Sequence, residues 1–218
     1  MVFVIAELGV NWRNLNEADE MIRECAAAGA DACKFQAYKP DMVDGPKRRA
    51  LIDIMLDESA VRYLYWRCLA AGVEFMCTPM YPEAVDMLDP YVKRWKIRHA
   101  DRNCMELINK CEKTGKPLLV SFSENTPDCF TRKREGINIL YCCPEYPPSE
   151  SPDLDFKGFD GYSCHIPFWD DIRSDLISHL KYLEVHVKRD HYPDGYCPID
   201  NAVSITMSEL AELCRRVK

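Results

Sequence analysis

Side chains able to do chemistry recur along this chain at the ends of short apolar runs. The first run, residues 2–6, ends at Glu7, with Asn11 just beyond it. Later runs end in the same way, at Lys34, Gln36, Thr78, Lys96, Ser121, Ser163, His165, Glu184 and His186. Each of these residues alone is more often structural than functional. Together they favour one site, because burying so many unpaired polar groups would cost free energy.

The types of these residues indicate which chemistry the site performs. Two lysines, Lys34 and Lys96, suit a ligand with several negative charges, such as a phosphate and a carboxylate on one small molecule. Two imidazoles on neighbouring strands, from His165 and His186, leave coordination positions open for water and substrate, as in catalytic metal sites. The pattern alone therefore indicates a metal-assisted reaction of a small phosphorylated acid.

Short apolar runs alternate with amphipathic stretches from end to end, which predicts parallel strands joined by helices. The predicted strands are residues 2–6, 31–36, 73–77, 92–97, 117–121, 137–142, 159–163 and 180–186. The predicted helices are residues 17–28, 58–71, 82–88, 104–113, 124–136, 170–179 and 206–217, with a brief helix at most in 146–157. Thr206 and Glu209 resemble a capping box. Eight such units predict a single (β/α)8 (TIM) barrel over residues 1–218, with some helices shortened.

The alternative architecture is an open, doubly wound sheet. It is weakened because no G-x-G-x-x-G or G-x-x-x-x-G-K-[ST] loop follows a predicted strand. Residues 38–57, between the second strand and the next helix, are predicted to form a polar loop. The basic run Lys47–Arg48–Arg49 within it is interpreted as solvated.

Composition excludes several classes of protein. The net charge of −7 and the scattered lysines and arginines argue against a nucleic-acid partner. The chain contains no run of about 18 apolar residues, so no membrane span is expected. Its twelve cysteines form no C-x-x-C pair, which argues against a zinc ribbon or a thioredoxin motif. We expect mostly free thiols and a cytoplasmic location.

Eight motifs, taken in order, resemble the N-acetylneuraminate (sialic acid) synthase family along almost the whole chain. They are FVIAELGVNW, AGADACKFQAY, GVEFMCTPMYPEAVDML, VKRWKI, TGKPLLVS, LYCCPEYPP, GYSCHI and LEVHVKRD. The specific features are AGAD-x-x-KFQ, TP-x-x-x-x-AVD-x-L, EYP and a last strand that ends in histidine. Each motif alone is common, and the combination is what identifies the family.

The resemblance implies a transferase that condenses phosphoenolpyruvate with an N-acetylated aldehyde sugar, such as N-acetylmannosamine, to give a nine-carbon keto acid and phosphate. A divalent cation, Mn or Mg, would be held by His165 and His186, and Glu7 and His186 would act in catalysis. The residues implied to bind phosphoenolpyruvate are Lys34, Thr78, Lys96, Ser121 and Ser163. The residues implied to contact the sugar are Gln36, Asp101, Tyr146 and Asp200.

The sequence departs from the family pattern at several motif positions, one of which, Pro144, removes a phosphate donor. His99 stands where the family has serine, Asp101 where it has glutamate, Pro144 where it has asparagine and Cys164 where it has aspartate. The family's C-terminal antifreeze-like domain is also expected to be missing, and with it an arginine that reaches a dimer partner's sugar pocket. We hypothesise that Arg98 substitutes for it. A homodimer, or a separate antifreeze-like chain, is the expected protein partner.

Two further functions stay open at this stage. One keeps phosphoenolpyruvate but uses a different aldehyde, because the sugar side has changed more than the lysines and histidines. The other is a non-catalytic barrel that binds a phosphosugar or a partner protein. The presence of Glu7, Lys34, Lys96, His165 and His186 favours an enzyme, whereas the departures favour the non-catalytic barrel.

Overall fold

The computed structural model describes residues 1–123, 136–148, 156, 158–167, 177, 179–192 and 194–218. The helices predicted at 124–136 and 170–179, and most of the region 146–157, therefore lie almost entirely outside the described residues. In the part of the chain that is described, no helix is both long and apolar enough to cross a lipid bilayer.

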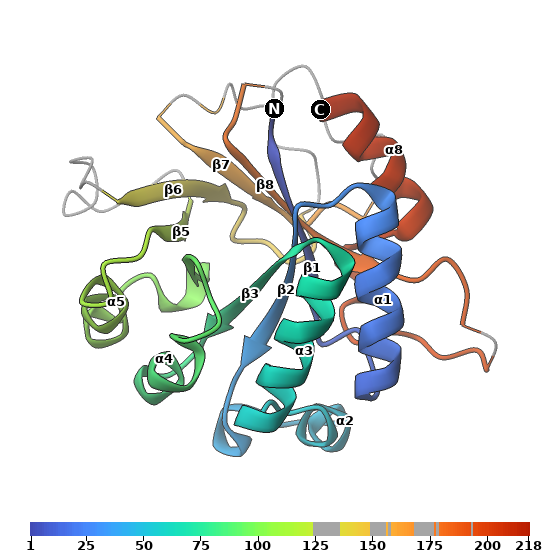
Figure 1. Ribbon diagram of the computed structural model, residues 1–218, viewed down its shortest axis with the longest axis horizontal. Coiled ribbons are helices and arrows are strands. Elements are labelled where there is room, and N and C mark those ends of the chain that lie inside the picture. Colours follow the sequence, from blue (N-terminus) through green and yellow to red (C-terminus); the bar gives the residue numbers. More distant parts are fainter. Residues whose placement is uncertain (124–135, 149–155, 157, 168–176, 178, 193) are drawn as a thin grey trace.

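Eight parallel strands form one sheet in the order β3-β2-β1-β8-β7-β6-β5-β4. β3 and β4, at the two ends of this order, pack side by side, so the sheet curves into a nearly closed barrel (Figure 1). The strands are β1 Phe3–Gly9, β2 Ala32–Ala37, β3 Glu74–Pro79, β4 Trp95–Ile97, β5 Leu118–Phe122, β6 Ile137–Cys142, β7 Gly161–Cys164 and β8 Tyr182–Lys188. A short additional strand, β9 (Ser204–Thr206), pairs with β8. The predicted (β/α)8 barrel is confirmed.

The helices lie outside the strands, and α8 lies beside α1 (Figure 1). They are α1 Leu15–Ala28, α2 Arg48–Asp53, α3 Glu58–Ala71, α4 Pro82–Leu88, α5 Met105–Glu112 and α8 Met207–Val217. Asn14 and Asp57 cap the first turns of α1 and α3 with their side-chain oxygens. The predicted capping box is confirmed, since Thr206 and Glu209 each accept a hydrogen bond from the other's backbone N–H.

The prediction of a polar loop between β2 and α3 was wrong. This segment contains a turn of 3-10 helix, Pro40–Met42, and the helix α2. Leu51 packs against the hydrophobic core, and its carbonyl accepts a 2.8 Å hydrogen bond from the Tyr38 hydroxyl. This apolar anchor, together with an i,i+4 ion pair between Arg49 and Asp53, makes a helix favourable there.

Some strand boundaries also differ from the predicted ones. β4 begins at Trp95 rather than at residue 92, because the backbone N–H of Val92 still bonds to the carbonyl of Leu88 at the end of α4. β8 runs later than predicted and ends at Lys188. These shifts do not change which residues lie at the carboxyl ends of the strands.

The barrel interior is built in layers. Its central apolar layer consists of Ile5, Ala32, Met76, Leu119 and Leu140, all fully buried. Because alternate residues of a strand face the same side, the residue two positions further along each strand points into the next layer up. Those residues are Glu7, Lys34, Thr78, Ser121 and Cys142. The two-residue period of the strands therefore places a polar layer directly above an apolar floor.

At Gly161 in β7, the backbone of β8 lies too close to leave room for a side chain. A Cβ atom added there would lie 2.6 Å from the carbonyl oxygen of Tyr182 and 3.0 Å from Cγ of Leu140. Both neighbours are held by the barrel, so neither has room to move away. Glycine at this position allows the two strands that carry the histidines to pair in register.

Gly161→Ala should lower the free energy of unfolding by about 1–3 kcal/mol, because the added methyl overpacks the interior of the barrel. Urea denaturation monitored by circular dichroism measures this change. Cys104→Ala, an exposed replacement, is the control and should change stability by less than about 0.5 kcal/mol. Equal stability of Gly161→Ala and the control would show that β7 and β8 separate easily.

Candidate active site

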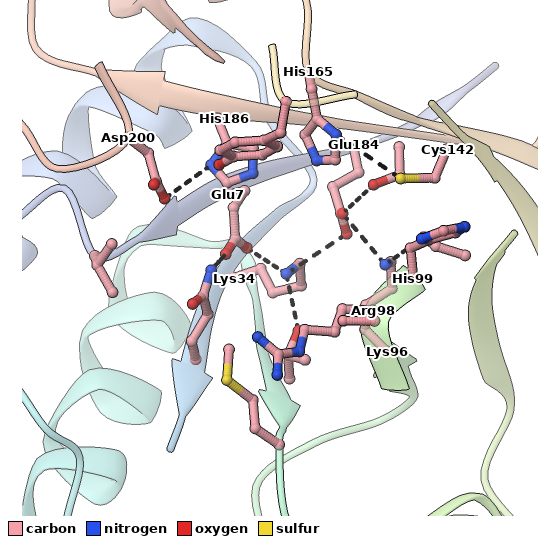
Figure 2. Close-up of a pocket in the computed structure, with 18 of the residues that line it drawn as sticks. Glu7, Lys34, Lys96, Arg98, His99, Cys142, His165, Glu184, His186 and Asp200 are labelled. Atoms are coloured by element: carbon pink, nitrogen blue, oxygen red, sulfur yellow. Dashed lines mark hydrogen bonds and ion pairs between the residues drawn. The ribbon is translucent and has the colours of Figure 1, made fainter. Parts of the chain in front are cut away.

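A cavity of about 450 Å³ opens at the carboxyl ends of the strands. All but one of the site residues predicted from the sequence line it; the exception is Asp101. Figure 2 shows that the charged residues converge on the centre of this cavity from opposite walls of the barrel. The four side chains on which the sequence prediction depends, Lys34, Lys96, His165 and His186, therefore share one mouth.

Lys34 extends from β2 into the cavity and is 3% exposed. Its ammonium group donates a 3.0 Å hydrogen bond to the Thr78 hydroxyl and forms an ion pair with Glu7. A second carboxylate, Glu184, lies 3.7 Å away. Burial alone would lower the pKa of Lys34, but Glu184 and Glu7 outweigh it and raise the pKa. Lys34 is therefore a permanent positive charge.

Lys96 occupies the equivalent position on β4 and is also buried. Its ammonium group donates a 2.7 Å hydrogen bond to the Ser121 hydroxyl and lies 3.4 Å from a carboxylate oxygen of Glu184. Burial is the main cause of its lowered pKa, and the nearby positive charge of Lys34 adds to it. An additional anion beside Lys96 would oppose both effects, raise this pKa and favour the charged ammonium form.

Glu184 lies between the two lysines and was not assigned a role from the sequence. One oxygen accepts a 2.8 Å hydrogen bond from the Ser163 hydroxyl, and the other has no hydrogen-bond partner among the described residues. Burial alone would raise the pKa of Glu184, but Lys34, Lys96 and Ser163 lower it to about 2. The sequence could have revealed Glu184 as a site residue, because it lies two positions before His186 and so shares the inner face of β8 with it.

Glu7 differs from Glu184 in that its pKa is raised rather than lowered. Burial raises its pKa, although Lys34 and His186 lie close enough to oppose that effect. Gln36 donates a 2.7 Å hydrogen bond to one of its oxygens and so fixes its orientation. A Cβ at Gly9 would come within 2.9 Å of the same oxygen, so glycine leaves room for the carboxylate. A raised pKa suits a group that must both hold and release a proton.

The two histidines face each other across the cavity mouth. Their ring centroids are 5.2 Å apart, and the ring of Tyr146 lies 4.8 Å from that of His165 and 5.9 Å from that of His186. Burial, followed by the proximity of His186, lowers the pKa of His165 to about 3, so its imidazole is neutral at neutral pH. Neutral imidazole is the form that binds metal ions.

These two residues fit a divalent metal ion. Nδ1 of His186 is buried, makes no hydrogen bond to a described residue and lies 3.4 Å from a carboxylate oxygen of Asp200. A carboxylate beside a metal-binding imidazole is the usual arrangement that orients the ring. Among the described residues, no three His, Cys, Asp or Glu side chains already form a metal cage. A metal here would therefore keep positions for water or substrate.

Asn11 holds Asp200 in place and was not predicted to do so. Its side-chain amide donates 2.9 Å hydrogen bonds to the carbonyl of Val187 and to the hydroxyl of Ser204, and its oxygen accepts a 2.8 Å bond from the backbone N–H of Asp200. This one buried residue, just after β1, therefore ties together β8, β9 and the loop between them. Its position eleven residues from the start of the chain gave no sign of this long-range role.

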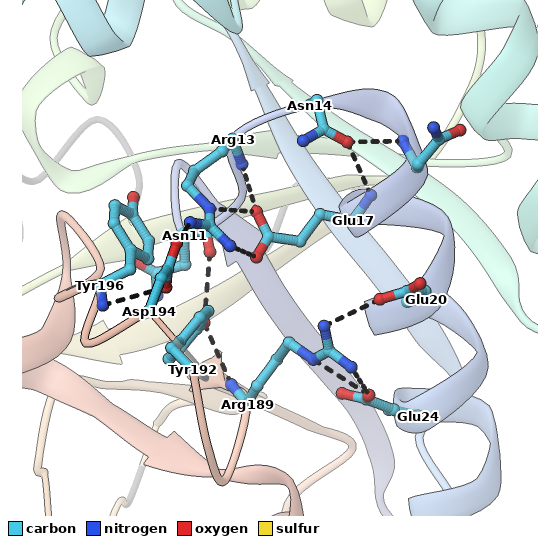
Figure 3. Close-up of polar contacts among 11 residues, drawn as sticks. Asn11, Arg13, Asn14, Glu17, Glu20, Glu24, Arg189, Tyr192, Asp194 and Tyr196 are labelled. Carbon is cyan, nitrogen blue, oxygen red and sulfur yellow. Dashed lines mark hydrogen bonds and ion pairs between the residues drawn. The ribbon is translucent and has the colours of Figure 1, made fainter.

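Ion pairs fasten the same loop to α1 (Figure 3). Arg189 bonds to Glu20 and Glu24 on the outer face of that helix, at 2.8 and 2.7 Å. Arg13, which precedes the helix, pairs with both Glu17 and Asp194. The loop that follows β8 is thus held at several points between the strand end and Asp200.

Asp101 does not line the cavity. It lies on a turn of 3-10 helix, His99–Asp101, where its carboxylate forms an ion pair with Arg98. Arg98 and His99 line the cavity in its place (Figure 2). Burial, then the charges of Arg102 and Lys96, lower the pKa of His99, and its Nε2 is buried without a hydrogen-bond partner among the described residues.

Comparison with known proteins places the chain in a family. The model of the NeuB family matches residues 21–218. The chain belongs to the NeuB family. It is 24% identical to the N,N'-diacetyllegionaminic acid synthase of Campylobacter jejuni over 99% of this chain and 75% of that protein. It is 25% identical to human N-acetylneuraminate-9-phosphate synthase, over 99% of this chain and 69% of that one.

A solved structure agrees with this assignment. The N-acetylneuraminic acid synthetase of Leptospira borgpetersenii, crystallised with citrate, superposes with a TM-score of 0.85 and 26% identity. The match covers 99% of this NeuB family chain and 82% of that one. The resemblance inferred from the eight sequence motifs is therefore confirmed at the level of the family.

Asn11→Ala should lower the free energy of unfolding by about 1–3 kcal/mol, because the change leaves buried backbone groups without partners. Asn16→Ala is the matched control, since Asn16 is exposed in the first turn of α1. Urea denaturation measures stability, and limited proteolysis reports on the loop after β8. A variant as stable and as protease-resistant as the control would contradict the positioning role of Asn11.

Proposed function

We propose that this NeuB family protein condenses phosphoenolpyruvate with an aldehyde sugar to form a sialic-acid-like keto acid and phosphate. The observation that carries the proposal is the pair of buried ammonium groups at the cavity floor. Each has its own hydroxyl partner, Thr78 for Lys34 and Ser121 for Lys96. A pair of fixed cations with hydroxyl groups beside them suits a small molecule that carries both a phosphate and a carboxylate.

Binding of phosphoenolpyruvate would change the partners of these lysines. At present Glu184 bridges them, at 3.7 Å from Lys34 and 3.4 Å from Lys96. These distances are longer than a direct charge-assisted hydrogen bond, so an incoming anion can make shorter contacts with both ammonium groups. Ser163, which now donates to Glu184, supplies a further hydroxyl. We assign Lys34, Thr78, Lys96, Ser121 and Ser163 to phosphoenolpyruvate.

The reaction needs one proton transfer that the site is equipped to make. C3 of phosphoenolpyruvate bonds to the aldehyde carbon, and the aldehyde oxygen gains a proton. Water adds at C2 and loses one proton, which balances the proton gained by the aldehyde oxygen. The bond between C2 and the phosphate oxygen then breaks, and the remaining proton of the water passes to the departing phosphate as the C2 hydroxyl becomes the keto oxygen. Glu7 is the group assigned to this transfer, because burial raises its pKa and Gln36 fixes its orientation.

His165 and His186 are the residues that would hold a divalent metal ion, Mn or Mg. Such an ion, when bound, polarises the aldehyde carbonyl toward attack. The contribution of the chain is to present two imidazoles on adjacent strands, with Asp200 beside Nδ1 of His186. The ring of Tyr146 packs against both imidazole rings.

The sugar is assigned to the outer part of the cavity. Gln36, Tyr146 and Asp200 line it there and carry an amide, a hydroxyl and a carboxylate suited to sugar hydroxyl groups. Asp101 keeps a role only through Arg98, whose guanidinium it orients. Arg98 thus presents a fixed cation to the cavity from the chain itself.

The decisive experiment measures phosphate release from phosphoenolpyruvate, with Mn²⁺ and a panel of aldehyde sugars. Lys96→Ala should reduce kcat/KM by at least about 100-fold, because it removes a buried charge that contacts the substrate. Lys110→Ala is the matched control, since that lysine is paired with Asp86 on the outside of the barrel. Absence of release with every sugar, despite tight binding of phosphoenolpyruvate, would instead support a non-catalytic binding barrel.

Metal binding provides a second, independent test. His186→Ala should weaken Mn²⁺ binding by more than about 100-fold, and Asp200→Asn by about 10–100-fold, because the carboxylate only orients the imidazole. His99→Ala, in the same cavity but on the opposite wall, is the control and should bind Mn²⁺ as the unmodified protein does. Calorimetric titration measures the affinities. Unchanged affinity in His186→Ala would remove His186 from the metal site.

A further inference from the structure

The two imidazoles at the cavity mouth each turn one ring nitrogen toward a side chain of the protein. Nδ1 of His186 lies 3.4 Å from a carboxylate oxygen of Asp200. Nδ1 of His165 lies 3.8 Å from Sγ of Cys142, the last residue of β6. Figure 2 shows Asp200 and Cys142 on opposite sides of the two histidines. A partner at Nδ1 leaves Nε2 of each ring available to a metal ion.

A second contact of Cys142 sets the direction of its contact with His165. The Cys142 thiol donates to the backbone carbonyl of Cys143, with a sulfur–oxygen distance of 3.6 Å. Burial raises the pKa of Cys142 to about 11, so the group keeps its hydrogen at neutral pH. Because a thiol has one hydrogen, the sulfur can only accept at its second contact. His165 is therefore the donor, through Nδ1–H.

The direction of this hydrogen bond determines the tautomer of His165. Its pKa is lowered to about 3, so the imidazole is neutral and carries a single proton, on one of its two nitrogens. Donation from Nδ1–H to the sulfur of Cys142 favours the tautomer with the proton on Nδ1. Nε2 then keeps a free electron pair, which is what a metal ion binds.

Cys142 is placed to act through His165 rather than as a ligand itself. Among the described residues, no three His, Cys, Asp or Glu side chains gather into a metal cage, so the sulfur does not join the two histidines. Cys142 is 3% exposed and pairs with Ser163 in the ladder between β6 and β7, two residues before His165. The backbone of the barrel therefore holds the sulfur beside the imidazole.

We propose that Cys142 is a positioning residue for the metal site, which fixes His165 in the Nδ1–H tautomer and so prepares Nε2 to bind a divalent ion. This inference rests on the metal site of the proposed function and adds a residue to it. Cys142 supports His165 as Asp200 supports His186, with a neutral thiol in place of a carboxylate. Sulfur is a weak acceptor, so its effect lies at the low end of those known for outer partners of metal ligands.

Nitrogen chemical shifts of the imidazoles test the tautomer in the metal-free protein. Nitrogen–proton correlation spectra distinguish Nδ1–H from Nε2–H, and His165→Gln identifies the signals of His165 by their absence. We expect Nδ1–H in the unmodified protein and a larger fraction of Nε2–H in Cys142→Ala, which lacks the acceptor. Cys142→Ser, which keeps a hydroxyl acceptor, should return the ring toward Nδ1–H. The same tautomer in the unmodified protein and in Cys142→Ala would overturn the inference.

Calorimetric titration with Mn²⁺ tests the consequence for metal binding. Cys142→Ala should weaken the affinity about tenfold. Cys77→Ala is the matched control and should leave it unchanged, because Cys77 is equally buried but lies on β3 and packs in the hydrophobic core. Equal affinities in the two variants would overturn the inference and leave His165 and His186 as the proposed ligands. Absence of Mn²⁺ binding by the unmodified protein would instead overturn the metal site, and the chemical shifts would still decide the role of Cys142.

Discussion

The electrostatic balance around Glu184 is the constraint on which the rest of the site depends. Two ammonium groups buried above an apolar layer are costly unless carboxylates lie beside them. Glu184 reaches both lysines from β8, and Glu7 reaches one of them from β1. In the absence of substrate, these contacts offset the free-energy cost of burying the two ammonium groups. The two Glu184 contacts, at 3.7 and 3.4 Å, are long enough for a more highly charged anion to replace them.

The strand geometry explains why all these groups reach one point. Parallel strands with the same two-residue alternation send corresponding residues to the same height in a barrel. Glu7 is level with Lys34 on one side and with His186 on the other, and Ser163 is level with Glu184. The close approach at Gly161 preserves this register between β7 and β8. The geometry of the candidate site is therefore set by backbone pairing rather than by the loops alone.

The barrel and most of the cavity lining were predictable from the sequence, because both depend on local periodicity. Lys34, Lys96 and the histidines each end an apolar run, and this pattern can be recognised without any knowledge of tertiary structure. Asp101 was misplaced because a turn of 3-10 helix rotates it away from the cavity toward Arg98. Glu184 was visible at a strand end, but its role depends on lysines that are distant in sequence.

The features that escaped prediction all depend on long-range contacts. Asn11 bonds to residues more than 170 positions away, and no spacing in the sequence reports that. The apolar cavity-lining residues that follow β2 lie in a segment without a regular period, where Pro40, Gly45 and Pro46 indicated a loop. α2 forms there because Leu51 packs against the hydrophobic core and the Tyr38 hydroxyl donates a hydrogen bond to the Leu51 carbonyl. Both contacts form only when the barrel has folded.

The order of the sheet has a mechanical consequence. β3 and β4 stand at opposite ends of the hydrogen-bonded order, so among the described strands no ladder joins β3 directly to β4. Glu184 spans this junction from across the barrel with its two oxygens. An anion bound to both ammonium groups would connect the two sides of this junction in place of Glu184, in addition to the packing of β3 against β4.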